Sequence, residues 1–134
     1  MTAIRIHAAV VDAMTAHARR ELPRECCGLL IGTPDLIDEA FPARNTREST
    51  TRYEVHPEDH FAAIRLARQT DRTVVGAYHS HPRGPDHPSE TDLAEARDSS
   101  LLYVIVSLAA DLAMVRAFHL EDGNFTTVAL VPLT

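Results

Sequence analysis

A buried strand that ends in two histidines restricts the fold of this chain more than any other feature. Residues 73–78, Thr-Val-Val-Gly-Ala-Tyr, are rich in β-branched and small apolar side chains, which is typical of a buried strand. His79 and His81 follow at its C-terminal end, and Pro82 ends the strand because proline has no N–H to donate. Side chains two positions apart share a face, so both imidazoles point the same way and could bind one ion.

A third candidate ligand lies beyond a loop. Residues 83–88 contain Gly and Pro and are expected to be irregular, whereas a helical pattern begins at Ser89 and places Asp92 in its first turn. A catalytic zinc ion typically has three protein ligands and one open position, and two histidines with one carboxylate are a usual set. His79, His81 and Asp92 are therefore candidate metal ligands.

Each of these features also has a purely structural interpretation. A His-x-His pair on a strand is often two histidines without a metal. Ser89 and Asp92 match a capping box, in which the serine accepts from the backbone N–H of Asp92 and the acid reaches back. The cap and a metal site are compatible, because a capped terminus would hold both side chains in fixed rotamers.

One carboxylate precedes a second apolar run. Glu25 stands directly before residues 26–31, Cys-Cys-Gly-Leu-Leu-Ile, which are expected to form a buried strand. An acid at the start of a core strand is usually a solvated charge. Its functional interpretation is a general base that takes a proton from a metal-activated water.

With these residues the chain resembles the JAMM, or MPN-plus, metalloprotease family. The family pattern is a glutamate, then His-x-His-Pro, then Ser-x-x-Asp, and the matching positions are Glu25, His79, His81, Pro82, Ser89 and Asp92. Flanking segments between about residues 4 and 120 also look like short bacterial members.

The resemblance implies roles for these residues. His79, His81 and Asp92 would bind one Zn²⁺ per chain, Glu25 would act as base and then acid, and Ser89 would stabilise the oxyanion. The implied fold is the cytidine-deaminase-like JAMM/MPN domain. The implied activity is hydrolysis of an amide or isopeptide bond at the C-terminus of a ubiquitin-like sulfur-carrier protein, for example with release of cysteine. An MPN-type scaffold without catalysis, or a metallopeptidase acting on other short peptides, is the alternative.

Composition sets broader limits. A chain of 134 residues is expected to form one domain, residues 1–134. The formal net charge of −6 argues against a nucleic-acid-binding surface. The two cysteines are adjacent, which favours a reduced setting, and the longest apolar run, residues 101–110, is too short to span a bilayer. We expect a cytoplasmic protein that does not associate with membranes.

The order of predicted elements is mixed. Helices are expected over 7–22, 57–69 and from 89 onward, and strands over 26–31, 73–81, 101–108, 113–120 and 125–131, with two more between 33 and 53. Asp-Gly within residues 121–124 predicts a hairpin. This order predicts a three-layer α/β (α+β) domain with a mixed, mostly antiparallel sheet flanked by helices. The apolar segment 128–133 could pair with another chain, so the oligomeric state stays open.

The remaining histidines and the two cysteines have mostly structural interpretations. His7, His17, His56 and His60 are expected to be surface or cap residues, and His119 structural, whereas His87 could line the cleft because it lies in the loop between the ligands. Of Cys26 and Cys27, one should be a core residue and the other could lie near the metal.

Three rival enzyme or metal-site classes have weaker support. A nucleobase deaminase would need His-x-Glu and Pro-Cys-x-x-Cys segments, which the sequence lacks. A cysteine hydrolase using Cys26 or Cys27 has no supporting motif. A structural zinc usually has four protein ligands, and Cys26 would have to supply the fourth.

Overall fold

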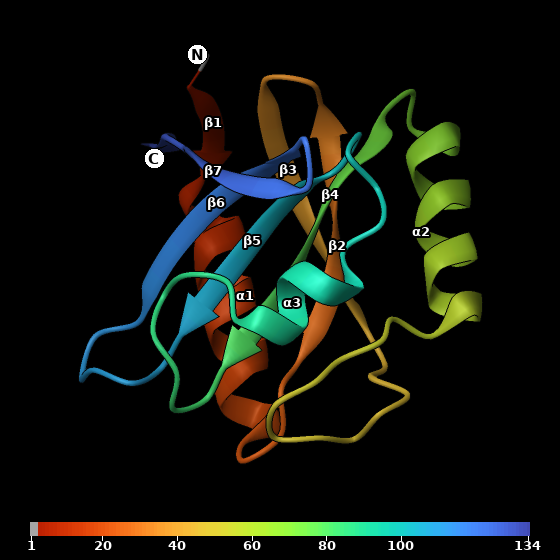
Figure 1. The fold of residues 1–134 in the computed structure, drawn as a ribbon. Helices are drawn as coiled ribbons and strands as arrows, with labels where there is room; N and C mark the ends of the chain where they lie inside the picture. The colour runs from red at the N-terminus through yellow and green to blue at the C-terminus, as the bar shows by residue number, and fades with distance from the viewer. Residues whose placement is uncertain (1–2) are drawn as a thin grey trace.

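The structure is a computed structural model that describes residues 3–134 (Figure 1). Its elements are, in chain order, β1 (Ile4–His7), α1 (Ala8–Glu21), β2 (Cys27–Thr33), β3 (Leu36–Ala43), α2 (Pro57–Gln69), β4 (Thr73–His81), α3 (Glu90–Glu95), β5 (Leu102–Ser107), β6 (Met114–Glu121), β7 (Asn124–Val128) and β8 (Leu130–Leu133). In the view of Figure 1, α1 lies behind the strands and α2 lies to their right.

The strands form one sheet in the order β7-β6-β5-β4-β2-β3-β1-β8. The pairs β7·β6, β6·β5, β4·β2 and β2·β3 are antiparallel, whereas β4·β5, β1·β3 and β1·β8 are parallel. The predicted mixed, mostly antiparallel sheet is therefore confirmed. Because β4 lies between β2 and β5 in the middle of the sheet, both of its edges are hydrogen-bonded to neighbouring strands.

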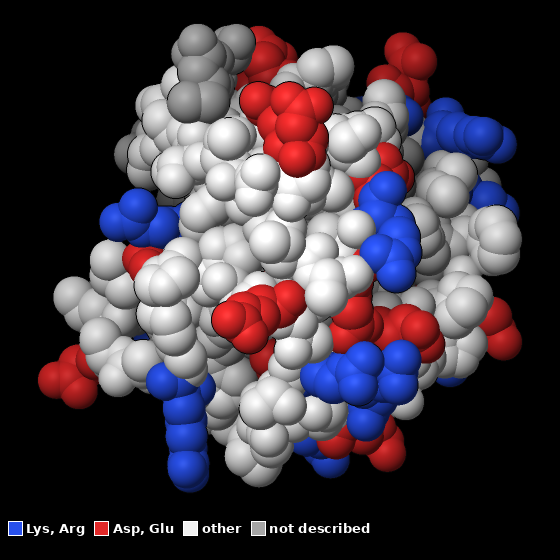
Figure 2. Space-filling view, viewed as in Figure 1, with Lys and Arg blue, Asp and Glu red and all other residues white. Residues whose placement is uncertain are grey.

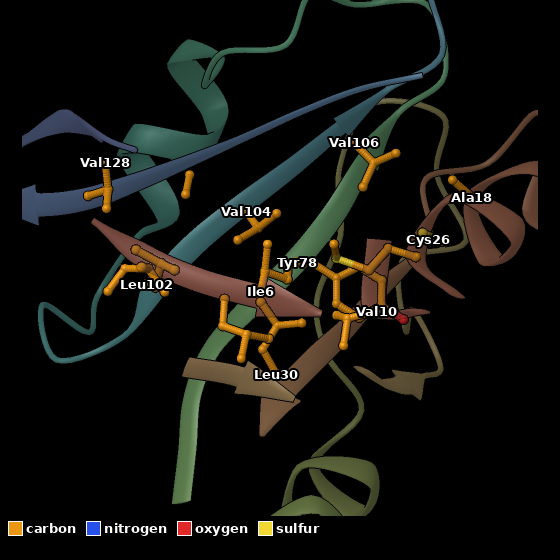
Figure 3. Packing of buried hydrophobic residues seen from close by; sticks show 14 residues of the cluster. Ile6, Val10, Ala18, Cys26, Leu30, Tyr78, Leu102, Val104, Val106 and Val128 are labelled. Atoms are coloured by element: carbon orange, nitrogen blue, oxygen red, sulfur yellow. The ribbon is translucent and has the colours of Figure 1, made fainter. Parts of the chain in front are cut away.

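Successive side chains of β2 point to opposite faces of the sheet, so they contribute to two separate hydrophobic clusters, one on each face. Leu30 packs with Val10 and Met14 of α1, whereas Leu29 packs with Ala63 and other residues of α2. Figure 3 shows the larger cluster, to which α1 contributes Val10 and Ala18. Helices on both faces of the sheet give the expected three layers.

Local sequence explains where the two long helices begin and end. His7 occupies the N-cap of α1, and Pro23 follows shortly after its C-terminus. Pro57 is the first residue of α2, and the side chain of His56 accepts a hydrogen bond from the N–H of Glu58. Both helices lie within one residue of their expected ranges.

Two parts of the predicted strand pattern were wrong. The segment between residues 33 and 53 forms one strand, β3, and its remainder contributes only an isolated bridge between Asn45 and Val55. The predicted strand 125–131 is split into β7 and β8, and β8 pairs in parallel with β1 of the same chain. The C-terminal segment therefore has a partner strand within its own fold.

The predicted hairpin is present. Glu121 and Asn124 close the turn between β6 and β7, and Asp122 and Gly123 have φ angles of 49° and 79°. Positive φ at both central residues defines the type I′ turn that Asp-Gly favours.

The expectation for His17 was wrong, because this side chain is buried. Its Nδ1 lies 2.8 Å from the hydroxyl of Tyr78, which has no exposed surface. The Tyr78 ring in turn lies over Gly28, where an added Cβ would meet Cε1 of the ring at 2.3 Å. Glycine is therefore required at this position.

The surface of the face shown in Figure 2 carries acidic and basic side chains interspersed with one another. None of the helices formed by residues 3–134 is long and apolar enough to cross a membrane.

Candidate metal centre

The candidate ligands come from the end of β4 and the first turn of α3. His79 and His81 are 2% and 5% exposed, and they lie on the same face of β4, as the alternation of the strand requires. Asp92 is 8% exposed and approaches them from α3. The structure thus brings together all three residues that the sequence singled out.

Three ligand atoms converge on one point. Nε2 of His79 lies 3.2 Å from Nε2 of His81, and Oδ2 of Asp92 lies 3.2 Å from the former and 2.9 Å from the latter. A tetrahedral zinc ion with bonds of about 2.0–2.1 Å would hold its ligand atoms about 3.3 Å apart. The distances and the donor types therefore fit a divalent metal ion.

The other ring nitrogen of His81 fixes its tautomer. Nδ1 lies 2.8 Å from the carbonyl oxygen of Pro85, and a carbonyl only accepts, so Nδ1 carries the proton. Nε2 then has its lone pair free to bind a metal. A carbonyl that orients a histidine in this way is typical of metal centres.

Asp92 is held by the capping box that the sequence predicts. The Ser89 hydroxyl accepts from the N–H of Asp92 at 3.0 Å, and Oδ2 of Asp92 accepts from the N–H of Ser89 at 2.9 Å. The same Oδ2 atom faces both imidazoles. One helix cap therefore orients the carboxylate toward the histidines.

The protonation of the triad reflects burial and mutual contact. Burial lowers the pKa of His79. Burial also opposes the charged form of His81, but the hydrogen bonds with Asp92 and Pro85 hold its pKa above the ordinary value. Burial favours the neutral form of Asp92, but its hydrogen bonds with both histidines lower its pKa overall, so it is ionised at neutral pH.

Glu25 is a buried acid in front of β2. Its side chain is 4% exposed, and among the described residues its Oε1 has no hydrogen-bond partner. Burial raises its pKa to about 8, with a smaller opposing effect from His81. The interpretation of Glu25 as an ordinary solvated charge is therefore wrong. A carboxyl group with a pKa near neutrality is suited to proton transfer.

An aromatic ring that no sequence pattern predicts contacts the site. The ring of Tyr53 stacks on the imidazole of His79, with centroids 4.2 Å apart and an interplanar angle of 18°. Tyr53 lies in the irregular segment between β3 and α2, where no periodicity signals its neighbours. Only the folded loop brings it against β4.

The polar residue that shapes this segment is Asn45. Its side-chain amide donates to the carbonyl oxygens of Glu25 and Arg52, and its Oδ1 accepts from the N–H groups of Arg47 and Glu54. The loop that carries Tyr53 is therefore tied to the backbone of Glu25.

A cleft of about 600 Å³ opens beside the triad. Its lining comes from the end of α1, the loop before α2 and the loop between β4 and α3, and it comprises Pro23, Glu25, Thr50, Thr51, His81, Pro82, Arg83, Gly84, Pro85, His87, Pro88, Ser89 and Glu90. The cleft thus contains the expected His87 as well as Arg83, which the sequence did not single out. Its volume is typical of a ligand site.

Neither cysteine belongs to the metal cluster. Cys26 packs in the cluster that faces α1, on the opposite face of the sheet from His79 and His81. Cys27 is fully buried opposite His79, and its thiol points to the carbonyl of Arg44 at 3.6 Å. Burial raises the thiol pKa values to about 11 and about 12, so neither is an activated nucleophile.

Solved structures with the same fold define the class of this protein. A JAB1/MPN domain protein from Archaeoglobus fulgidus matches with a TM-score of 0.62 at 19% identity, over 98% of this chain and 100% of that chain. A solution structure of a protein from Desulfitobacterium hafniense matches with a TM-score of 0.91 at 30% identity, over 97% and 92% of the two chains. The fold is therefore that of a JAB/MPN domain.

The chain belongs to the prokaryotic homologues of the JAB domain, whose family model matches residues 7–121. It is 34% identical over 124 residues to the CysO-cysteine peptidase of Mycobacterium tuberculosis, over 90% of this chain and 85% of that protein. It is also 34% identical over 125 residues to a probable TtuB-protein conjugate cleaving protease of Thermus thermophilus, over 92% and 79% of the two proteins. The resemblance to the JAMM/MPN family and the expectation of a hydrolase are confirmed.

Proposed function

We propose that this chain is a zinc-dependent peptidase that hydrolyses an amide bond at the C-terminus of a ubiquitin-like sulfur-carrier protein and releases the attached amine, for example cysteine. The observation that carries the proposal is the convergence of His79, His81 and Asp92 beside the buried acid Glu25 and the Ser89 hydroxyl. Relatives named as a CysO-cysteine peptidase and a TtuB-protein conjugate cleaving protease support the substrate class.

His79, His81 and Asp92 would hold the zinc ion. Two imidazoles and one carboxylate leave the fourth tetrahedral position open, as catalytic zinc requires. Bound there, zinc would supply a Lewis acid that polarises the scissile carbonyl and makes water more acidic.

Glu25 would move the proton. It would accept a proton from the attacking water, whose oxygen forms a bond to the carbonyl carbon. It would then donate that proton to the nitrogen as the C–N bond breaks, which gives a carboxylic acid on the carrier and a free amine. The remaining proton of the attacking water then passes from the carboxylic acid to the amine, leaving a carboxylate and an ammonium group. A carboxyl pKa near 8 suits both steps, because a general acid–base works best when its pKa lies near the working pH.

Ser89 would stabilise the oxyanion. Its hydroxyl oxygen already accepts from the N–H of Asp92, so its own hydrogen is free to donate toward the cleft. The helix cap and the oxyanion role therefore use different parts of one hydroxyl group, and the cap fixes the position from which it donates.

The setting proposed for this activity is the cytoplasm, with residues 1–134 acting as one catalytic domain. Both cysteines are free and buried, which is in keeping with a reducing compartment.

The test combines metal content with turnover. The purified protein is expected to bind one zinc per chain, and His81→Ala and Asp92→Asn should lose it, whereas His119→Ala, which removes a histidine on β6, should keep it. The substrate is a diglycine-tailed sulfur-carrier protein extended by one cysteine, and a chelator should abolish its cleavage. A parent protein that binds no metal, or that cleaves equally well with chelator, would contradict the proposal and favour the scaffold alternative.

A further inference from the structure

We propose that Arg83 forms a carboxylate-binding subsite, so that the leaving group is a single amino acid with a free α-carboxylate and not a lysine side chain of another protein. This inference rests on the proposed function and deepens it, because it specifies the chemistry on the leaving-group side of the bond.

The position of Glu25 identifies the leaving-group side. The acid that protonates the leaving nitrogen must lie within hydrogen-bond reach of it. Glu25 lines the 600 Å³ cleft together with Ser89. A second cleft of about 380 Å³ is lined by Asp92 and Tyr53, and Glu25 is not part of its lining. The leaving group therefore lies in the larger cleft.

Backbone contacts hold one wall of that cleft in place. The wall is the loop between β4 and α3, residues 82–89. The carbonyl of Gly84 accepts from the Ser107 hydroxyl at 2.7 Å, and the carbonyl of Pro85 accepts from His81 at 2.8 Å. A loop anchored through its backbone can present its side chains in defined directions.

The next residue of the loop is anchored through its side chain. The Asp86 carboxylate accepts from Nε of Arg116 on β6 at 2.7 Å. The Asp86 carboxylate is therefore paired with Arg116 and not with Arg83, the cation of the cleft.

The exposed cation of this wall is Arg83. It is the only arginine among the residues that line the larger cleft, and within residues 3–134 no carboxylate oxygen lies within 4.0 Å of its guanidinium. Glu90 also lines the cleft but is not paired with Arg83. The guanidinium is therefore available to a ligand.

A free guanidinium in this place discriminates between leaving groups. It can bind a carboxylate through two parallel N–H···O bonds, which is the strong and directional form of this contact. A single amino acid attached through its amine carries its own carboxylate a few bonds from the scissile nitrogen. A lysine side chain of a folded protein instead brings only uncharged methylene groups at the corresponding distance from its nitrogen, and its backbone carbonyl, several bonds further away, is also uncharged. The subsite thus favours removal of one terminal amino acid.

The test uses two substrates that differ in one group. A sulfur-carrier protein ending in Gly-Gly-Cys is prepared with a free C-terminal carboxylate and as the C-terminal amide. The parent enzyme should cleave the acid with a kcat/KM about 10- to 100-fold above that of the amide, which corresponds to one charge-assisted contact. Arg83→Gln should remove this preference by slowing only the acid, and Arg83→Lys should restore part of it. Arg65→Gln, which removes an exposed arginine on α2, should leave both rates unchanged.

Binding provides a second readout. The Kd of each substrate is measured on the Glu25→Gln protein and on the Glu25→Gln, Arg83→Gln double variant. The acid should bind more tightly than the amide only when Arg83 is present. The subsite would be overturned if the parent enzyme cleaved and bound the acid and the amide equally well. It would also be overturned if Arg83→Gln lowered kcat/KM for the acid and for the amide by the same factor. Absence of cleavage of either substrate by the zinc-loaded parent would instead overturn the proposed function, and the Kd values would still decide the subsite.

Discussion

The hydroxyl oxygen of Ser80 accepts a hydrogen bond from the backbone N–H of Cys26 across 2.8 Å. The N–H of Ser80 donates in return to the carbonyl of Cys26 at 3.1 Å. Ser80 stands between His79 and His81, the two candidate histidine ligands, and Cys26 follows Glu25 directly. These bonds extend the pairing of β2 with β4 by one residue beyond the Cys27–His79 pair. They therefore link the strand that carries both histidines to the backbone next to Glu25.

Replacing Ser80 by Ala should therefore weaken both stability and activity. The substitution leaves the buried N–H of Cys26 without its partner, which costs about 1–3 kcal/mol in the free energy of unfolding. Metal content should be kept, because no ligand is removed. Urea denaturation measures the stability, and Ser99→Ala, at an exposed position, should change it by less than about 0.5 kcal/mol. A Ser80→Ala protein with parental stability and turnover would contradict the structural role of this bond.

Glu25→Gln should separate proton transfer from metal binding. Glutamine keeps the size of the side chain but cannot carry the proton, so kcat should fall on the order of 10² to 10⁴-fold. Zinc content, measured on the same sample, should remain one per chain. Loss of zinc together with activity would indicate instead that Glu25 is needed to form the metal site.

Glu25 should also make the stability of the metal-free protein depend on pH. Burial raises its pKa from 4.5 to about 8, so the folded state binds more protons than the unfolded state between these values. The stabilising effect of the bound proton is complete below about pH 4.5 and is lost as the pH rises through about 8. The difference in unfolding free energy between the parent and Glu25→Gln, measured from pH 4 to 9, should follow this curve. A flat difference would show that Glu25 ionises normally.

Metal affinity should increase with pH. Hydrogen bonds with Asp92 and Pro85 hold the pKa of His81 above its ordinary value, and a metal can bind Nε2 only after the imidazolium has lost a proton. The apparent affinity for zinc should therefore fall as the pH is lowered from 8 to 5. Competition with a chromophoric chelator at each pH measures this directly. An affinity independent of pH would argue against histidine ligation.

The stack of Tyr53 on His79 predicts a difference between two substitutions. Tyr53→Phe keeps the aromatic ring and should retain metal affinity and turnover. Tyr53→Ala removes the aromatic ring that stacks on the His79 imidazole, and it should weaken zinc affinity roughly 10-fold or more. Losses of this size are typical when a residue that contacts a metal ligand, but not the metal itself, is removed. Equal behaviour of the two variants would show that the ring does not position His79.

The parts of the fold that sequence could predict are those with a local signal. The helix before Pro23, the helix after His56 and the Asp-Gly hairpin each depend on neighbouring residues in the chain. The parallel pairing of β8 with β1 joins the two ends of the chain, and no local pattern encodes such a contact. His17 was misplaced for the same reason, because its partner, Tyr78, is 61 positions away.

The residue types at the candidate site, and the elements that carry them, could be predicted from the sequence. The alternation of a strand places His79 and His81 on one face, and the first turn of a helix places Asp92 beside Ser89. The environment of these groups depends on the folded chain: the burial that raises the pKa of Glu25, the stacked ring of Tyr53 and the cleft with Arg83. Periodicity and caps act over a few residues, whereas burial and electrostatics depend on segments that meet only when the chain has folded.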